Sequence, residues 1–325
     1  MKYLAIDVGG TSTRTVVVRE DGTCVGYGRA GSGNPTSSGT DNAVAAIVEA
    51  TRCAMAHAGS APAEIGAGVV GIAGTNAETG EWLRVEVANA GVPERLTFEA
   101  DLLVAFFSGS LAADGYAIVA GTGAAAIRVR GGQIEAICDG LGWLLGDAGS
   151  GFWIGHRAVL AATRALDRCG PATLLADLFT AQLGIEQIAE RAPSGRGVAL
   201  DQVVRAVYQM RPVELARFAP LVFEAAEHDD EMALQIVANA AQALAATLAA
   251  IVVPDISGPL VLGGSILSQQ PAIAERVVRS LRDPADFITV SDGLAGAAVL
   301  ALRHGGVDVD DTVFARIHAS LSTLR

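Results

Sequence analysis

Two short turns rich in glycine and threonine carry the clearest chemistry in this chain. The first follows the apolar run 3–8, and the second follows the apolar run 117–120. Because glycine has no Cβ, the backbone N–H groups of such turns can approach an anion closely. Either turn alone could be an ordinary hairpin connection, but together they predict opposite walls of one polyphosphate site. The candidate phosphate contacts are Gly9, Gly10, Thr11, Gly121, Thr122 and Gly123.

Two aspartates stand where a carboxylate could serve phosphoryl transfer. Asp7 directly precedes the first turn, where it could hold a hydrated Mg²⁺ near phosphate oxygens or cap the turn backbone. Asp101 stands where a strand-like segment meets a helix. There it could cap the helix or accept a proton from a substrate hydroxyl. Glu99 is a nearby competitor for the second role.

A third glycine turn, Gly263-Gly264-Ser265, follows the apolar run 260–262 and precedes a predicted helix. It could let a flat nucleoside pack against backbone, or it could merely turn the chain. The second interpretation is favoured for this turn taken singly. Three glycine turns at strand ends are nevertheless more specific for a nucleotide site than any one of them.

Two polar loops could supply ligands for the hydroxyl groups of a sugar. Asp147 lies in a tight glycine-rich turn just before a helix, where it could cap that helix or bind two hydroxyls. Asn34 lies in the polar loop 31–36, either as a turn residue or as a hydroxyl ligand.

The elements that must position these residues alternate between strands and helices, which predicts α/β layers. A chain of 325 residues exceeds one average domain, so we expect two. The three-strand pattern restarts at Gly115, which indicates an internal duplication, and residues 150–254 are almost entirely helical. The predicted strands are 2–8, 14–19, 23–29, 66–72, 96–99, 115–121, 124–130, 133–138 and 260–262, and the predicted helices include 40–57 and 101–111.

Composition and sequence pattern argue against a nucleic-acid partner and against a membrane-spanning segment. A formal net charge of −12 disfavours nucleic acid. The apolar stretch 238–253 carries Asn239, Gln242 and Thr247 and is shorter than a typical membrane span, so we expect a buried helix and no membrane contact. Met1 and Lys2 lead directly into a strand, so no signal peptide is predicted and a cytoplasmic location is expected.

Several runs of this chain together resemble a known superfamily. They are IDVGGTSTR, GNPTSSG, EADLLVAF, AGTGAA, GLGWLLGDAGSGFWIG, LVLGGSIL and DGLAGAAVLAL. Nearly the whole chain resembles the actin/hexokinase/Hsp70 fold and, more narrowly, the eukaryotic-type N-acetylglucosamine kinases and BadF/BcrA-type ATPases. The resemblance implies an α/β protein of two actin-like (ribonuclease-H-like) domains, each a mixed sheet flanked by helices, with a cleft between them. The implied limits are 1–113, 114–303 with a helical insertion at about 150–254, and a C-terminal helix 304–325 that packs back on the first domain.

The resemblance also implies ATP-dependent phosphorylation of a sugar, at the C6 hydroxyl. Asp101 matches the catalytic aspartate that orients and deprotonates this hydroxyl, and Asp7 matches the Mg²⁺-associated aspartate. The matching nucleotide residues are the two phosphate turns, Arg14, Gly263, Gly264, Ser265 and Gly296. The matching sugar residues are Asn34, Asp101, Thr122, Asp139, Gly140 and Asp147. A homodimer is a further expectation from this family.

Three departures from the N-acetylglucosamine kinases bear on the sugar. Those enzymes carry serine at Ala73, asparagine at Ala125 and glycine at Asp139. The first two departures remove polar groups expected near an N-acetyl group, and the third adds a carboxylate that could bind an ammonium. We therefore expect glucosamine, converted to glucosamine 6-phosphate, with N-acetylglucosamine or glucose as alternatives. The alternative for Asp139 is a turn residue, which the following glycine permits.

Two other function classes compete with a kinase. An ATPase that activates a redox enzyme, as in the BadF/BcrA branch, would need clustered cysteines for an iron–sulfur cluster. A sugar-sensing regulator would bring a DNA-binding helix-turn-helix, but the chain begins with a strand. The cysteines are scattered and predict reduced thiols, at Cys24, Cys53, Cys138 and Cys169.

Overall fold

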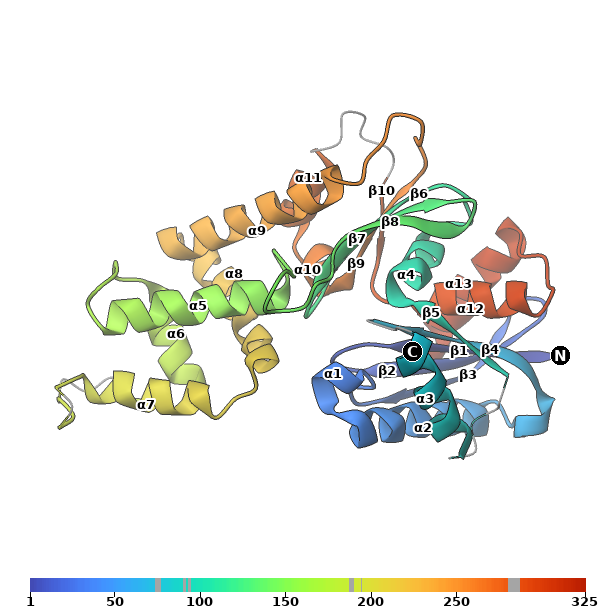
Figure 1. Ribbon diagram of the computed structural model, residues 1–325, viewed down its shortest axis with the longest axis horizontal. Helices are drawn as coiled ribbons and strands as arrows, with labels where there is room; N and C mark the ends of the chain where they lie inside the picture. Colours follow the sequence, from blue (N-terminus) through green and yellow to red (C-terminus); the bar gives the residue numbers. More distant parts are fainter. Residues whose placement is uncertain (74–76, 90–91, 93–94, 187–189, 194, 280–286) are drawn as a thin grey trace.

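Two five-stranded mixed sheets form the framework of the molecule (Figure 1). The computed structural model describes residues 1–73, 77–89, 92, 95–186, 190–193, 195–279 and 287–325. The first sheet contains β1 (Lys2–Val8), β2 (Thr13–Arg19), β3 (Cys24–Ala30), β4 (Ile65–Ile72) and β5 (Leu96–Ala100). The second contains β6 (Gly115–Ala120), β7 (Ala124–Arg130), β8 (Gln133–Asp139), β9 (Leu260–Gly263) and β10 (Phe287–Val290).

The two sheets share one topology. Their strand orders are β3-β2-β1-β4-β5 and β8-β7-β6-β9-β10. In each sheet the first three strands form an antiparallel meander, and the last two run parallel to the first strand. This identity confirms that the predicted strand pattern restarts at Gly115. The predicted strand 115–121 stops one residue early because Gly121 already belongs to the turn.

Helices cover the faces of both sheets and connect their parallel strands. The first part of the chain contributes α1 (Pro35–Ser38), α2 (Thr40–His57), the 3₁₀ turn η1 (Pro62–Glu64), α3 (Ala77–Asn89) and α4 (Asp101–Gly109). The middle contributes α5 (Gly151–Leu166), α6 (Leu174–Gln182), α7 (Val198–Tyr208), the 3₁₀ helix η2 (Pro212–Phe218), α8 (Ala219–Glu227) and α9 (Glu231–Ala249). The last part contributes α10 (Gly264–Gln269), α11 (Pro271–Val278), α12 (Leu294–His304) and α13 (Asp311–Leu324).

The last two helices lie on the first sheet, although they follow the second in sequence (Figure 1). α12 packs against β1, β4 and α4, and α13 packs against β3. The Cys24 N–H donates to the Ser320 hydroxyl at 2.9 Å, which fastens α13 to that strand. The domain limits drawn from the sequence stay a prediction, and this packing favours ending the second domain before α12.

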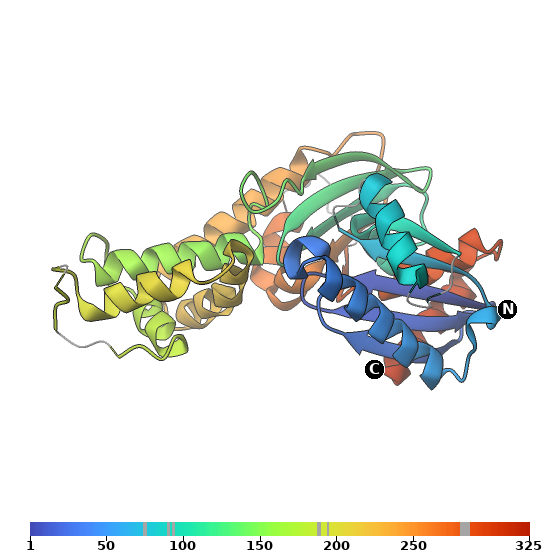
Figure 2. The ribbon, with the colours of Figure 1, turned by 60° about the horizontal axis from the view of Figure 1, so that its bottom comes forward.

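Helices α5 to α9 form a helical extension that projects away from both sheets (Figure 2). Among the described helices, α9 is long and apolar enough to cross a membrane by length and composition. It packs instead against α5, α8 and α11, with Ile236, Leu244 and Leu248 buried. α9 is therefore a core helix of the extension.

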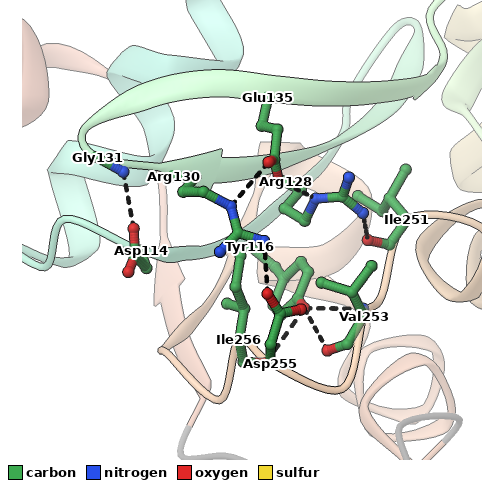
Figure 3. Close-up of polar contacts among 10 residues, drawn as sticks. All are labelled: Asp114, Tyr116, Arg128, Arg130, Gly131, Glu135, Ile251, Val253, Asp255 and Ile256. Atoms are coloured by element: carbon green, nitrogen blue, oxygen red, sulfur yellow. Dashed lines mark hydrogen bonds and ion pairs between the residues drawn. The ribbon is translucent and has the colours of Figure 1, made fainter.

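A polar clamp fixes the end of this extension to the second sheet (Figure 3). Arg128 on β7 donates to the Ile251 carbonyl at 2.7 Å and to the Glu135 carboxylate at 2.6 Å. The Tyr116 hydroxyl on β6 accepts from the Val253 N–H at 3.1 Å. The chain leaving α9 is therefore held where it turns toward β9.

Candidate active site where the two sheet edges meet

The carboxyl ends of three parallel strands stop at the same level in each sheet. Binding sites of open α/β sheets form beyond such ends. The candidate glycine turns begin at or directly after these ends, Asp101 follows β5, and Asp7 is the second-to-last residue of β1. The paired terminal residues are Val8, Ile72 and Ala100 in the first sheet, and Val119, Gly263 and Val290 in the second.

The carboxyl ends of the strands of the two sheets come together at Asp7. The Gly293 N–H, just beyond β10, donates to the Asp7 carboxylate. A Cβ at Gly293 would lie 2.8 Å from Asp7 Oδ1, so only glycine fits there without displacement. Arg14 lies between Asp7 and Asp292, with Nη1 3.4 Å from Asp7 Oδ2 and Nε 3.7 Å from Asp292 Oδ2. One guanidinium therefore bridges carboxylates from both sheets.

The surroundings of Asp7 favour binding of a cation. The pKa of Asp7 is raised to about 7, first by burial and then by the nearby charge of Asp292. Arg14 and the Gly293 N–H oppose this shift, while the charge of Asp101 adds to it. An incompletely compensated carboxylate of this kind is stabilised by a divalent cation, for which carboxylate oxygens are suitable ligands.

Asp101 is the first residue of α4 and follows the end of β5. Its Oδ1 accepts the Leu102 N–H at 2.9 Å, and burial raises the pKa of the carboxyl to about 6. Glu99, the competitor from the sequence, has its carboxylate 3.6 Å from the His304 ring. The geometry therefore favours Asp101 over Glu99 as the base.

The first phosphate turn is a tight and partly open loop. The Gly9 N–H donates to the Ser12 carbonyl at 3.0 Å, which closes the turn. Gly9 and Gly10 are half-buried, and Thr11 is exposed. The backbone between β1 and β2 is thus accessible at the edge where Asp7 lies.

The second and third turns pack against each other. The Gly121 N–H donates to the Gly123 carbonyl at 2.9 Å, and a Cβ at Gly121 would meet nothing within 4 Å. Gly264 adopts φ +83°, and a Cβ there would overlap the Ala120 carbonyl oxygen and lie 2.9 Å from the Gly121 nitrogen. Gly264 therefore sets the distance between β9 and the second turn.

The start of α5 holds the second turn in place. The Gly151 and Phe152 N–H groups donate to the Gly121 and Thr122 carbonyls at 2.7 and 3.1 Å. These are helix-start N–H groups that have no partner within the helix. The helical extension is thus joined directly to a candidate phosphate contact.

The glycine-rich loop after β8 is fixed by two aspartates with positive φ. Asp139 accepts the N–H groups of Asp147 and Ala148 at 2.7 and 2.9 Å, one on each carboxylate oxygen. Asp147 Oδ1 accepts the Ala124 N–H at 3.1 Å, and Gly140 donates to the Ala124 carbonyl at 3.0 Å. These bonds favour the turn role for Asp139, which the sequence left open.

Asp147 retains capacity for a ligand. Burial raises its pKa, and the charge of Asp139 raises it further. Within the described chain, Asp147 Oδ2 has no hydrogen-bond partner. The pair therefore places concentrated negative charge beside the second turn.

The other predicted residues lie in different surroundings. Asn34 is half-buried before α1, and its carbonyl accepts from the Ser38 N–H at 3.0 Å. Gly263 is buried within β9, whereas Ser265 is exposed. Gly296 is wrong as a nucleoside contact because it is buried where α12 crosses α4, with its N–H donating to the Ser108 hydroxyl at 2.8 Å.

Two site residues were missed in the sequence. Asp292 follows β10 and accepts the Arg325 Nη2 at 2.7 Å and the Leu294 N–H at 3.0 Å. Its only signal was a carboxylate shortly after the short run 287–290, which was not among the predicted strands. Arg325 had no comparable signal, because its approach depends on how α13 packs.

Comparisons with known proteins agree with this geometry. The sequence profile of the BadF/BadG/BcrA/BcrD ATPase family matches residues 4–301. The glucosamine kinase GspK of Vibrio cholerae is 26% identical over 302 residues, covering 92% of this chain and 95% of that protein. The N-acetyl-D-glucosamine kinase of Dictyostelium discoideum is 26% identical over 323 residues, covering 93% and 98%.

Solved structures show the same fold. A Chromobacterium violaceum protein with a suggested N-acetylglucosamine kinase activity aligns with a TM-score of 0.70 at 22% identity, covering 92% of this chain and 98% of that one. A ROK family glucokinase of Streptomyces griseus, solved with glucose and AMPPNP, aligns with a TM-score of 0.57 at 18% identity, covering 93% and 100%. These likenesses confirm the predicted two-domain, actin-like fold.

Proposed function

Because the chain belongs to the BadF/BadG/BcrA/BcrD ATPase family, we propose that it is an ATP-dependent kinase of amino sugars. The reaction would transfer the γ-phosphoryl group of ATP to the C6 hydroxyl of glucosamine. The observation that carries the proposal is the placement of Asp101, a half-buried carboxylate beside the strand ends where Asp7 and three glycine turns also lie.

Asp101 suits the role of base for a sugar hydroxyl. Phosphoryl transfer needs mainly positioning and charge stabilisation, with a carboxylate to orient the attacking hydroxyl. A pKa of about 6 leaves Asp101 mostly ionised at neutral pH, yet more basic than an exposed aspartate. Asp101 would accept the hydroxyl proton as the new P–O bond forms and the bond to ADP breaks.

Asp7 and the glycine turns suit the nucleotide. The buried, incompletely compensated Asp7 carboxylate fits a hydrated Mg²⁺, which when bound would neutralise charge on the phosphate oxygens. Backbone N–H groups at Gly10, Thr11 and Thr122 are candidates to hold those oxygens. Arg14 would supply a positive charge at the same edge.

Glucosamine is favoured by the charge beside the second turn. This field comes chiefly from Asp147, because both oxygens of Asp139 already accept backbone N–H groups, whereas only Oδ1 of Asp147 does so. Such a field favours a protonated amine over a neutral acetamide. Similarity to a glucosamine kinase supports this choice, and equal similarity to an N-acetyl-D-glucosamine kinase keeps the acetylated sugar as the alternative.

A coupled assay of ADP release tests the proposal. Glucosamine, N-acetylglucosamine, glucose and mannosamine would be compared with a blank without sugar, and Asp101→Asn would serve as the inactive control. We expect saturable release with glucosamine at the highest kcat/KM, and a 6-phosphate product by ³¹P NMR. Fast release in the blank, unchanged by any sugar, would instead support an ATPase that activates a partner enzyme.

The predicted homodimer and cytoplasmic location belong to the same proposal. Light scattering of the purified protein at assay concentration would measure the oligomeric state.

A further inference from the structure

Asp292 is the most heavily bonded carboxylate at the meeting of the two sheets. Its side chain is 8% exposed. Oδ1 accepts from the Leu294 N–H at 3.0 Å and from Arg325 Nη2 at 2.7 Å. Oδ2 lies 3.4 Å from the Ser291 hydroxyl and 3.7 Å from Arg14 Nε. Of the two arginines that contact Asp292, Arg325 is therefore the closer and Arg14 the more distant.

Arg14 is held loosely between two carboxylates. Its distances of 3.4 Å to Asp7 and 3.7 Å to Asp292 exceed the separation of a strong charge-assisted hydrogen bond, about 2.7–2.9 Å. Neither carboxylate binds the guanidinium fully, so its position depends on both. Because Arg325 occupies the other side of Asp292, it limits how strongly Asp292 attracts Arg14.

We propose that Asp292 is a positioning residue, anchored by Arg325 beside α13, that keeps the guanidinium of Arg14 available at the nucleotide edge. The inference rests on the proposed function for its assignment of ATP to this edge. In this proposal α13, which packs on β3, helps to support the nucleotide site.

Two substitutions would shift Arg14 in opposite directions. Asp292→Asn removes one carboxylate charge, so Arg14 moves fully onto Asp7 and masks it. Arg325→Gln removes the counter-charge from Asp292, which then draws Arg14 away from Asp7. Both changes weaken nucleotide binding, and neither touches the loops assigned to the sugar.

The experiment compares Asp292→Asn, Arg325→Gln, the double variant and Arg316→Gln. Arg316 is the matched control because it also joins α13 to the first sheet region, through an exposed pair with Asp21 at 3.3 Å. Each variant would be measured for the KM of ATP, the KM of sugar and its Tm. Calorimetry would give the affinity for ADP with and without Mg²⁺.

We expect the KM of ATP and the Kd of Mg·ADP to rise about tenfold in each single variant, the size of one charge-assisted contact. The KM of the sugar should stay within about twofold of the wild-type value. In the double variant, the increase in the KM of ATP should be smaller than the product of the two single increases, because the two residues act as one unit. Arg316→Gln should alter neither nucleotide constant.

Two results would overturn the inference. One is a loss of Tm in Asp292→Asn and Arg325→Gln with unchanged nucleotide constants, which would mean a purely structural role. The other is an equal effect in Arg316→Gln. If the wild type shows no sugar-dependent ADP release, the proposed function fails, but the Mg·ADP affinities still decide this inference.

Discussion

Asp101 and Asp7 are two carboxylates whose folded surroundings disfavour the ionised form. The pKa of Asp101 is raised to about 6 and that of Asp7 to about 7, in both cases chiefly by burial. Groups with such shifts gather at functional sites, because catalysis needs a charge that the fold would otherwise avoid. The same shifts make measurable predictions for activity and stability.

Asp101→Asn should lower kcat by about 10²–10⁴-fold while leaving the KM of both substrates nearly unchanged. For the wild type, kcat/KM for the sugar should fall as pH is lowered through about 6, since protonation of Asp101 removes the base. Initial rates at saturating ATP between pH 5 and 8 would check this. Turnover of the variant close to that of the wild type would refute the assignment.

The same variant should be more stable than the wild type at high pH. Because the folded pKa lies above that of an exposed aspartate, the folded state binds the proton more strongly, and the free energy of unfolding declines as pH rises from about 4 through 6. Asparagine carries no such cost. Its advantage in Tm should therefore be present near pH 8 and shrink toward pH 4.

Asp139 and Asp147 should respond differently to loss of charge. Asp139→Asn weakens two bonds to backbone N–H groups, so it should cost about 1–3 kcal/mol of stability and lower kcat/KM for glucosamine and glucose alike. Asp147→Asn leaves an oxygen for the Ala124 N–H but removes charge, so it should lower kcat/KM for glucosamine more than for glucose. Steady-state kinetics with both sugars would check this, and a selective loss for glucosamine in Asp139→Asn would reverse the two roles.

At the scale of elements, the site depends on how close one turn can come to another. Gly264 combines a φ of +83° with contact to the Ala120 carbonyl, so neither its backbone nor its Cβ position tolerates a side chain. This closeness is possible because β9 and β6 pair in parallel and end together. The geometry of this candidate site therefore follows from strand register as much as from the turn residues.

Gly264→Ala should destabilise the protein by about 1–3 kcal/mol through backbone strain, and more through displacement of the second turn. It should also raise the KM of ATP. Gly131→Ala is the matched control, because Gly131 also has a positive φ of +59° but a Cβ there meets nothing within 4 Å. Thermal unfolding and ATP titration of both variants would separate the effect of backbone strain from that of contact with the second turn. Equal losses of stability and of ATP affinity in the two variants would show that this contact is unimportant.

Sequence patterns predicted the local elements of the site well. Helix 40–57 and the strands on both sides of each glycine turn follow from periodicity and turn chemistry, which are properties of neighbouring residues. The role of Asp139 could not be predicted, because the loop conformation decides whether its oxygens meet backbone or ligand. Arg325 could not be predicted either, since its contact with Asp292 depends on the packing of α13.

At the scale of the molecule, the two sheets are joined through α4 and α12. α4 contacts strands of both sheets, and α12 crosses it while packing on β1 and β4. Gly296 permits the close crossing, since a Cβ there would overlap the Val104 carbonyl oxygen. The assignment of Gly296 from family resemblance was wrong because a glycine in a helix crossing and a glycine near a ligand look the same in sequence.

The helical extension has a consequence of a different kind. The first helix of the extension starts at the carbonyls of Gly121 and Thr122. The chain that leaves its last helix, α9, is bound by Tyr116 and Arg128. Both attachment points therefore lie on the β6–β7 hairpin. Because the chain enters and leaves the extension on one hairpin, a change in the length of its helices need not alter the spacing between the strand ends of the two sheets.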